Sequence, residues 1–307
     1  MRLIKGTLDF QIEDRCVVTL GKFDGVHRGH QALIDRVVTY VPEDNRKELI
    51  RTVISFDTAP TMILSKKERR KMLEKRGIDL LIECPFIAEL ISMDPETFVK
   101  KMLVDQLHVA HVVVGEDFRF GYHRAGNPQI LYELGKKYGF TVEVVEDILD
   151  GDKKISSTYI REALSQGQME KVNELLGYEY YITGEVVHGR QVGRTIGIPT
   201  TNLIPSKSKM LPPNGVYVTR STVGKETYVG MTNIGCKPTV EGGFVGVETY
   251  LFDCDADLYG EKEKVRVLHY IRPEKKFDGL EQLKAQLKLD ENEIRTYVKN
   301  MENQPKK

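Results

Sequence analysis

The first half of this 307-residue chain alternates short apolar runs with amphipathic segments, and no other feature restricts the fold as strongly. Residues 17–20 form an apolar run that ends at Gly21, and the segment that follows carries apolar side chains at helical spacing. The same rhythm predicts strands over residues 17–20, 52–56, 78–82, 111–114 and 141–145, and helices over 30–41, 67–76 and 129–138, with a further helix capped by Asp94 and begun by Pro95. This alternation indicates an α/β domain in which helices cover both faces of a parallel sheet.

The second half changes character after Gly177. From residue 180 to residue 272, short β-branched and aromatic runs are separated by glycine and proline, which predicts a small antiparallel β-barrel. A terminal helix is predicted over residues 280–301, with one apolar face made by Leu283, Leu287, Ile294 and Val298. We therefore expect two domains, residues 1–178 and residues 179–307.

The bulk composition restricts the partners and the compartment. Lysine plus arginine (45) balance aspartate plus glutamate (45), so there is no electrostatic signature of a protein that binds nucleic acid or an anionic membrane. None of the four cysteines stands at a CxxC spacing, which argues against a zinc site. The first residues contain no apolar run of signal-peptide length, and no segment is long and apolar enough to cross a bilayer. We expect a reduced, cytoplasmic protein with small-molecule partners.

The ten residues 21–30 lie between a predicted strand and a predicted helix, at the sheet edge where ligands bind in open α/β folds. Three glycines let the backbone turn tightly and approach a ligand closely: Gly21, Gly25 and Gly29. The helix directs free N–H groups and its positive dipole end to the same place. His27 and His30 share one face of its first turn and can donate hydrogen bonds to phosphate oxygens. The alternative is two surface histidines on a turn, but the whole context favours phosphate binding.

Residues 21–30 resemble the GxFDGVHxGH signature of bacterial flavin adenylyltransferases, within the HxGH nucleotidylyltransferase superfamily. Residues 115–121 and 155–162 resemble two further conserved stretches of that family, the second of them ISSTxIR. The resemblance implies a Rossmann-like domain that transfers the adenylyl group of ATP to FMN, with His27, His30 and Arg161 as catalytic residues. It implies that ATP and its phosphates are bound by Gly21, Phe23, Asp24, Gly25, Gly29, Gly115, Asp117, Ser157 and Thr158.

The ISSTxIR stretch has a physical interpretation of its own. Ser157 or Thr158 can cap the helix that follows, and Arg161 lies in its first turn, which predicts a second anion-receptive helix end. The alternatives are capping alone and a solvated helix charge. The nucleophile in the adenylyl step is the phosphate of FMN, which is already ionised near neutral pH and needs no general base. Positioning and charge neutralisation by His27, His30, Arg161 and Mg²⁺ should therefore carry that step.

Residues 184–203 resemble the riboflavin kinase module, whose hallmark is a glycine- and arginine-containing loop followed by PTAN. Further matches lie at residues 213–217, 233–239, 247–250 and 257–260. The two resemblances follow one another in the order found in bacterial bifunctional riboflavin kinase/FAD synthetases. The second implies that ATP and flavin are bound by Gly189, Arg190, Gly193, Gly197, Thr200, Asn202 and Asn233.

Thr201 stands where that family usually has alanine. If the segment is extended, Thr200 and Asn202 point to one face and Thr201 to the other. Thr200 and Asn202 then offer neutral oxygens suited to Mg²⁺, which binds hard oxygen ligands along with substrate phosphates. We expect the threonine to be tolerated because it lies on the opposite face. The alternative is that Thr200 and Asn202 form a turn after Pro199.

Glu248 lies in an apolar, aromatic run in which alternation places it on one face with Tyr250 and Phe252. The resemblance implies that it is the catalytic base. The ribityl hydroxyl of riboflavin is a weak nucleophile, so a positioned carboxylate can accept its proton as the γ-phosphate is transferred. The alternative is a solvated carboxylate at a sheet edge.

The two resemblances together imply a bifunctional enzyme that converts riboflavin to FMN in the barrel and FMN to FAD in the N-terminal domain, each with MgATP. We expect riboflavin, FMN and FAD to be substrates and products rather than prosthetic groups. One alternative is that only one half is active, because residues 56–60 depart from the family's proline-histidine-proline-like stretch and Lys154 stands where some relatives have arginine. The other is a non-catalytic regulator that responds to flavin or nucleotide.

Overall fold

The structure is a computed structural model that describes residues 1–42, 49–57, 59–189, 197–237 and 244–303. The chain divides into two compact units, Met1–Ser157 and Thr158–Lys307. This division falls inside a helix that the two units share. The expected domains, residues 1–178 and 179–307, remain a prediction about independently folding segments.

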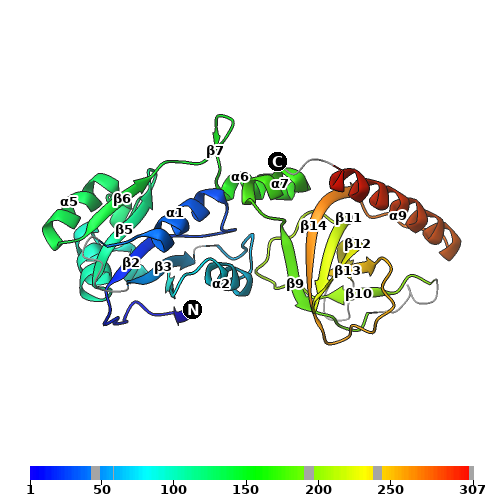
Figure 1. The fold of residues 1–307 in the computed structure, drawn as a ribbon, viewed down its shortest axis with the longest axis horizontal. Helices are drawn as coiled ribbons and strands as arrows, with labels where there is room; N and C mark the ends of the chain where they lie inside the picture. Colours follow the sequence, from blue (N-terminus) through cyan, green and yellow to red (C-terminus); the bar gives the residue numbers. More distant parts are fainter. Residues whose placement is uncertain (43–48, 58, 190–196, 238–243, 304–307) are drawn as a thin grey trace. The chain divides into compact units, whose positions relative to one another are not determined.

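The first unit is built on a six-stranded sheet in which every neighbouring pair of strands is parallel (Figure 1). The strands are β1 (Arg2–Lys5), β2 (Cys16–Gly21), β3 (Ile50–Asp57), β4 (Leu80–Pro85), β5 (Val109–Gly115) and β6 (Thr141–Val145), in the order β1-β4-β3-β2-β5-β6. All five expected strands are confirmed. The edge strand β1 was not expected, because a charged four-residue segment at the start of the chain carries no strand pattern.

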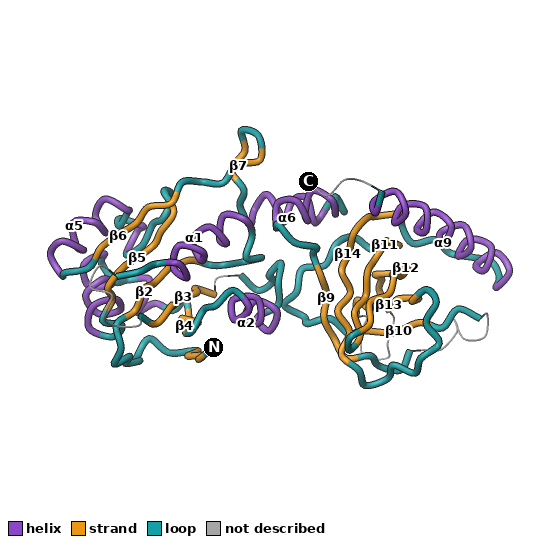
Figure 2. The backbone as a smooth tube through the Cα atoms, in the orientation of Figure 1, coloured by secondary structure: helices purple, strands orange, loops and turns teal. Residues whose placement is uncertain are grey.

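Helices cover both faces of this sheet (Figure 2). They are α1 (Arg28–Thr39), α2 (Lys66–Lys75), α3 (Ala88–Ile91), α4 (Pro95–Phe98), the π-helix η1 (Val99–Asp105), the short 3₁₀ turn η2 (Tyr122–Arg124) and α5 (Pro128–Tyr138). The helix start predicted at Asp94 is confirmed, since its carboxylate accepts hydrogen bonds from the N–H groups of Glu96 and Thr97. Helix α1 packs on β2, β3 and β5, so its N-terminus meets the carboxyl end of β2.

The prediction that Ser157 or Thr158 caps a helix is wrong. A short hairpin, β7 (Leu149–Asp150) and β8 (Lys153–Lys154), leads into α6 (Ser157–Ser165), whose first two residues are Ser157 and Thr158. The Ser157 hydroxyl donates a hydrogen bond of 2.9 Å to the carbonyl oxygen of Asp24, so within the first unit it contacts the phosphate-binding segment instead of accepting from the N–H groups of the helix. Arg161 is the fifth residue of α6 and therefore lies beyond its first turn.

The second unit contains an antiparallel six-stranded sheet that curls into a half-barrel (Figure 1). Its strands are β9 (Tyr181–Glu185), β10 (Thr200–Leu203), β11 (Gly215–Val223), β12 (Glu226–Lys237), β13 (Phe244–Leu251) and β14 (Lys262–Arg272), in the order β10-β13-β12-β11-β14-β9. Just past β9, the Val187 N–H donates to the Asn202 carbonyl at 2.9 Å, so the two edge strands approach each other at one end. This architecture confirms the predicted small antiparallel barrel.

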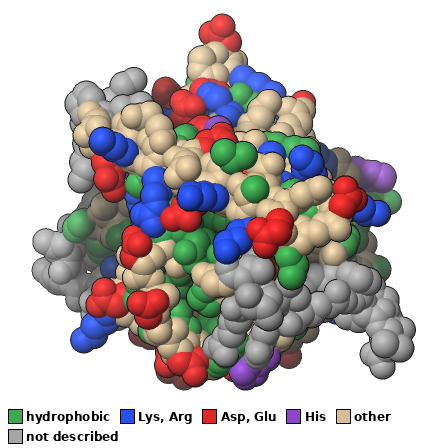
Figure 3. Space-filling view, turned by 90° about the vertical axis from the view of Figure 1, so that its right-hand side faces the viewer, with side chains coloured by type: hydrophobic (Ala, Val, Ile, Leu, Met, Phe, Trp, Pro, Cys, Tyr) green, Lys and Arg blue, Asp and Glu red, His purple; other side chains and the backbone are tan. Residues whose placement is uncertain are grey.

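Two more helices complete this unit, α7 (Met169–Leu176) and the terminal α9 (Leu280–Glu302). The predicted terminal helix is confirmed: Ile294 and Val298 of α9 are buried against Val218 and Met231 on the outer face of the half-barrel. On the face of the molecule shown in Figure 3, basic and acidic side chains are interspersed. In the described ranges, no helix combines the length and apolar character that a membrane span requires.

Candidate active sites

The segment after β2 has a strained backbone. Phe23, Gly25 and Val26 have φ angles of 48°, 80° and 43°, and the two that are not glycine store roughly 1–3 kcal/mol each. Both of those side chains are fully buried, which holds them in place. The Asp24 carboxylate accepts a hydrogen bond of 2.7 Å from the Ile63 N–H, so this predicted ATP contact has a structural partner within the protein.

His27 is the N-cap of α1. Its Nδ1 atom accepts a hydrogen bond of 3.4 Å from the His30 N–H, and Nδ1 can accept only if it carries no proton. The neutral ring must then carry its proton on Nε2, which is left as a donor. Burial, reinforced by the positive charge of Lys154, lowers the pKa of His27 to about 4, so the ring is neutral at pH 7.

His30 lies directly over His27. The two imidazole rings are stacked with 3.7 Å between their centroids, and the Phe23 ring lies 5.0 Å from that of His30. Burial lowers the pKa of His30 well below its ordinary value, and His27 and Lys154 lower it further. Its Nδ1 atom is buried and has no hydrogen-bond partner among the described residues. The pair therefore presents two neutral imidazoles at a helix N-terminus, where an anion would be stabilised.

A cluster of charged residues centred on Lys154 acts on this pair. The Lys154 ammonium group lies 2.6 Å from Asp117 Oδ2 and 2.6 Å from Asp147 Oδ1, and its charge acts on both imidazoles. The structure thus brings the predicted site residue Asp117, which follows Gly115 at the end of β5, close to His27. Lys154 was noted only as a departure from the family. Its position just before the ISST stretch was the signal that could have included it.

The glycines of the segment have different surroundings. A side chain at Gly29 would lie 3.3 Å from the His27 ring, and one at Gly25 would lie 3.1 Å from Ile63, where φ is also positive. Gly21 ends β2 beside the Phe23 ring. Thr158 and Arg161 belong to the second unit, where the Arg161 guanidinium lies 4.0 Å from the sulfur of Met210.

Sequence reasoning missed a group of aromatic side chains in the first unit. Phe118 and Phe120 are stacked with 5.4 Å between ring centroids, Phe98 lies 5.6 Å from Phe120, and Phe56 lies 6.4 Å from Phe98. Phe56 and Phe118 are only half-buried: Phe56 lies near the carboxyl end of β3, and Phe118 follows the carboxyl end of β5. In the divergent stretch 56–60, Thr58 lies outside the described residues.

The predicted kinase residues form a row across three neighbouring strands. The strand register pairs Asn202 of β10 with Glu248 of β13, and Glu248 with Asn233 of β12. The Thr200 hydroxyl donates a hydrogen bond of 2.7 Å to Glu248 Oε1. Thr201 points away from this row, and its hydroxyl donates to the Thr249 carbonyl at 3.3 Å. The expected alternation is confirmed, and the alternative of a turn at Thr200 and Asn202 is wrong because both lie within β10.

The structure also shows the surroundings of Gly189, Asn233 and Gly197, three further residues that the resemblance assigns to the kinase site. A Cβ atom at Gly189 would lie 2.5 Å from the Asn202 amide, so only glycine lets the chain pass this close. Asn233 donates a hydrogen bond of 3.3 Å to Glu274, and Gly197 has a φ of 77°. Arg190 and Gly193 lie outside the described residues.

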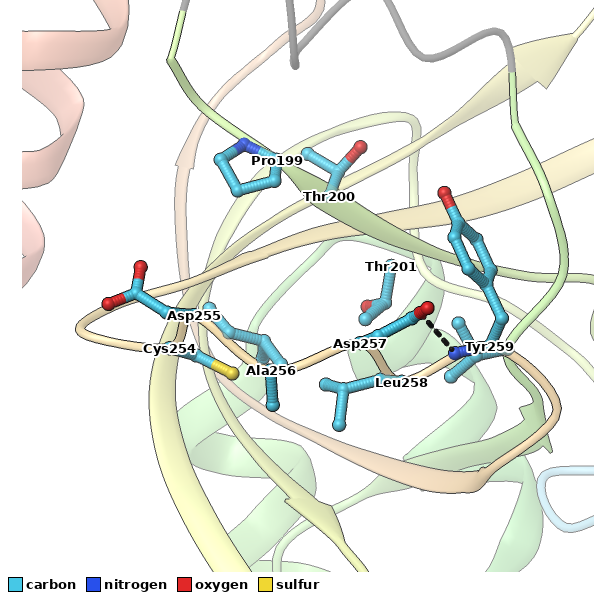
Figure 4. A pocket seen from close by; sticks show the side chains of 11 residues that line it. Pro199, Thr200, Thr201, Cys254, Asp255, Ala256, Asp257, Leu258 and Tyr259 are labelled. Carbon is cyan, nitrogen blue, oxygen red and sulfur yellow. Dashed lines mark hydrogen bonds between the residues drawn. The ribbon is translucent and has the colours of Figure 1, made fainter.

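A pocket of about 360 Å³ opens beside Thr200, within the usual size range of small-molecule sites. Figure 4 shows Pro199 and Thr200 on one side of it and residues 254–259 on the other. Asp257 accepts a hydrogen bond of 3.3 Å from the Tyr259 N–H. The His188 ring stacks on the Tyr259 ring, with 3.7 Å between the ring centroids. The pocket thus joins the predicted 257–260 motif to the row of kinase residues.

Comparisons with known proteins match the two halves of the chain to two families. Residues 9–159 match the FAD synthetase family and residues 176–298 match the riboflavin kinase family. A protein of Escherichia coli (strain K12) named bifunctional riboflavin kinase/FMN adenylyltransferase is 35% identical over 311 residues, which cover 97% of this chain and 98% of that protein. This chain belongs to the bifunctional riboflavin kinase/FMN adenylyltransferase family.

Other members of this bifunctional family are equally similar. The Bacillus subtilis (strain 168) protein of that name is 36% identical over 302 residues, which cover 94% of each chain. A crystal structure described as a macrolide-efflux protein from Streptococcus pneumoniae superposes with a TM-score of 0.84 at 32% identity, covering 96% of this chain and 99% of that one. The similarity to members of the family therefore extends over both units.

Proposed function

We propose that the second unit phosphorylates riboflavin to FMN and that the first unit adenylylates FMN to FAD with release of pyrophosphate. Membership of the bifunctional family supports both activities. The observation that carries the assignment to residues is the row of Thr200, Asn202 and Glu248, which joins a carboxylate base to neutral oxygen donors beside a pocket.

In the kinase reaction, Glu248 takes the proton of the ribityl hydroxyl while that oxygen bonds to the γ-phosphorus and ADP leaves. The hydrogen bond from Thr200 fixes one carboxylate oxygen in place. Thr200 and Asn202 are the residues that would hold Mg²⁺, which fits a compact set of hard oxygen donors. The ion would neutralise phosphate charge when bound.

The pocket beside Thr200 suits the nucleoside part of ATP. Its walls include the apolar side chains of Val186, Pro199, Leu251 and Leu258 together with the Tyr259 ring. Thr200 lines this pocket and also contacts Glu248, so a nucleoside bound there would direct its phosphates towards the base. This assignment accounts for a pocket that combines apolar walls with polar side chains and lies next to the catalytic groups.

In the adenylyl reaction, the FMN phosphate attacks the α-phosphorus of ATP and pyrophosphate leaves. The His27 Nε2–H and the His30 ring would donate hydrogen bonds to phosphate oxygens whose charge grows in the transition state. The N-terminus of α1 and the Lys154 ammonium add positive potential. Arg161 is proposed as a further cation for the phosphates, and the aromatic group around Phe118 as a surface for the flavin ring.

The test is incubation of the purified protein with riboflavin, ATP and Mg²⁺, with the flavins separated by chromatography. FMN should appear first and FAD should follow. FMN alone would restrict activity to the second unit, and FAD made only from added FMN would restrict it to the first. The absence of any flavin phosphorylation or adenylylation would overturn the proposal.

A further inference from the structure

The inside of the half-barrel carries an unusual number of polar side chains. Six of them are at most 7% exposed: Thr201, Thr219, Ser221, Thr232, Thr249 and Glu263. Buried hydroxyl groups lower stability unless they are hydrogen-bonded, so an apolar residue of similar shape is the usual choice at such positions. The clustering of these residues on one face calls for a specific reason.

Four of them form a continuous series, which we name the threonine ladder: Thr201, Thr249, Thr232 and Thr219. The Thr201 hydroxyl donates to the Thr249 carbonyl at 3.3 Å. The Thr249 and Thr232 hydroxyl oxygens are 2.8 Å apart, and those of Thr232 and Thr219 are 2.7 Å apart. The Thr219 hydroxyl also donates to the Gly230 carbonyl at 3.0 Å. The ladder therefore connects β10, β13, β12 and β11 across the inner face.

The ladder and the kinase row lie back to back on the same strands. Thr201 lies between Thr200 and Asn202, Thr249 follows Glu248, and Thr232 precedes Asn233. Successive side chains of a strand point to opposite faces, so every ladder residue on β10, β13 and β12 has a row residue directly behind it. A shift of one strand against its neighbour would move both sets together.

We propose that the threonine ladder is a positioning device for riboflavin phosphorylation, which holds Asn202, Glu248 and Asn233 in register. This inference rests on the proposed kinase function of the row. Hydroxyl hydrogen bonds are directional, whereas apolar contacts between smooth side chains tolerate sliding along the strand. A misplacement of reacting groups by about 1 Å can slow a reaction on the order of a hundredfold, so small gains in register matter.

Thr201 gives the ladder its outermost member. Alanine, the residue that the PTAN pattern has there, carries no hydroxyl and cannot make the contact to Thr249. The ladder in this chain is therefore longer by one hydrogen bond than that pattern allows. Thr232 is its centre, because its hydroxyl meets those of both Thr249 and Thr219.

The test uses Thr232→Val and Thr249→Val in the full chain, since valine keeps the shape of threonine and removes the hydroxyl. For each variant, kcat and KM are measured for riboflavin phosphorylation, FMN adenylylation is measured as an internal reference, and the melting temperature is recorded. We expect kcat for phosphorylation to fall about tenfold, with smaller changes in KM and unchanged adenylylation. Thr232→Ser and Thr249→Ser keep a hydroxyl group, so most of the kcat for phosphorylation that the valine variants lose should be present in them.

The matched control is Thr227→Val. Thr227 is exposed near the turn between β11 and β12, where its hydroxyl lies 2.9 Å from that of Thr222, so the variant also breaks a threonine pair but far along the strands from the row. It should leave kcat unchanged.

Phosphorylation by folded valine variants within twofold of the wild type would overturn the positioning role, as would a loss that serine does not repair. If Thr232→Val fails to fold, Thr249→Val and Thr201→Val, each of which removes a single hydroxyl, decide by the same criteria. A wild-type chain without phosphorylation would instead contradict the proposed function itself.

Discussion

The two candidate sites hold their residues in opposite ways. In the first unit, His27 and His30 depend on a strained backbone, since Phe23 and Val26 adopt positive φ angles and Asp24 is tied to Ile63 and Ser157. In the second, Thr200, Asn202 and Glu248 lie on regular strands, and their relative positions follow from strand register. A tight turn lets backbone N–H groups and imidazoles surround an anion, whereas a sheet face spaces side chains regularly.

The two sites also differ in the proton chemistry that they offer. The first contains imidazoles kept neutral by burial and no carboxylate that has to act as a base, which suits a nucleophile that is already ionised. The second contains Glu248, which suits a hydroxyl nucleophile that must lose a proton. The comparison teaches that one chain can combine adenylyl transfer and phosphoryl transfer when each unit provides a base only where its nucleophile must lose a proton.

The largest effect is expected for Glu248→Gln. Amide replacement removes the base, so riboflavin phosphorylation should fall by roughly 10²–10⁴-fold while adenylylation of added FMN persists. Steady-state rates with each flavin substrate measure both activities. Glu226→Gln, at the exposed turn between β11 and β12, is the control and should leave both rates unchanged. Equal loss of the two activities in Glu248→Gln would contradict the separation of the sites.

The reciprocal variant is His30→Ala. Removal of one phosphate donor should slow FAD formation by roughly 10²–10³-fold and leave FMN formation intact. Chromatography of the flavins made from riboflavin would then show FMN accumulating. His123→Asn is a control on an exposed histidine of the same unit, with a residue that tolerates its positive φ. FMN formation that falls in parallel with FAD formation would show that the units are not independent.

The third effect is on the pH dependence of stability, and it concerns the first site alone. The pKa of folded His27 is about 4, below the unfolded value of about 6.5, so the unfolded chain binds more protons between these values. Its stabilising contribution is complete above pH 6.5 and is lost as the pH falls towards 4, by up to about 2 kcal/mol between pH 7 and pH 5. His27→Asn keeps a good N-cap and removes this titration. Thermal unfolding at the two pH values should show a weaker pH dependence in the variant, and an identical dependence would contradict this account.

The smallest effect is expected at Glu263 inside the half-barrel, and it has the opposite sign. Burial raises the pKa of this carboxyl group despite the neighbouring hydroxyls of Thr201 and Ser221. The folded form therefore holds its proton more tightly, and stability falls as the pH rises from about 4.5 through the folded pKa. Glu263→Gln should melt at a higher temperature than the wild type at pH 8 and equally at pH 4. A variant that is less stable at pH 8 would show that the carboxylate is stabilised by other contacts.

Much of the fold could be predicted from local patterns. Five strands of the first sheet, the helix capped by Asp94 and the terminal helix were predicted because their periodicity lies within a dozen or so neighbouring residues. The edge strand β1 was missed, since its four residues pair with β4 almost eighty positions away. The error at Ser157 has a similar origin: its hydroxyl finds Asp24, which no local capping rule includes.

By itself the sequence determined the α/β first half, the β-rich second half and the motifs that place histidines at a helix start and Glu248 on a strand face. Only the tertiary structure decided that Lys154 meets Asp117, that Asn202, Glu248 and Asn233 form one row, and that four threonines join behind it. The physical reason is the separation along the sequence of the residues that make each contact. Periodicity and capping depend on residues a few positions apart, whereas these contacts join distant residues through strand order and register, which the packing of the whole sheet selects.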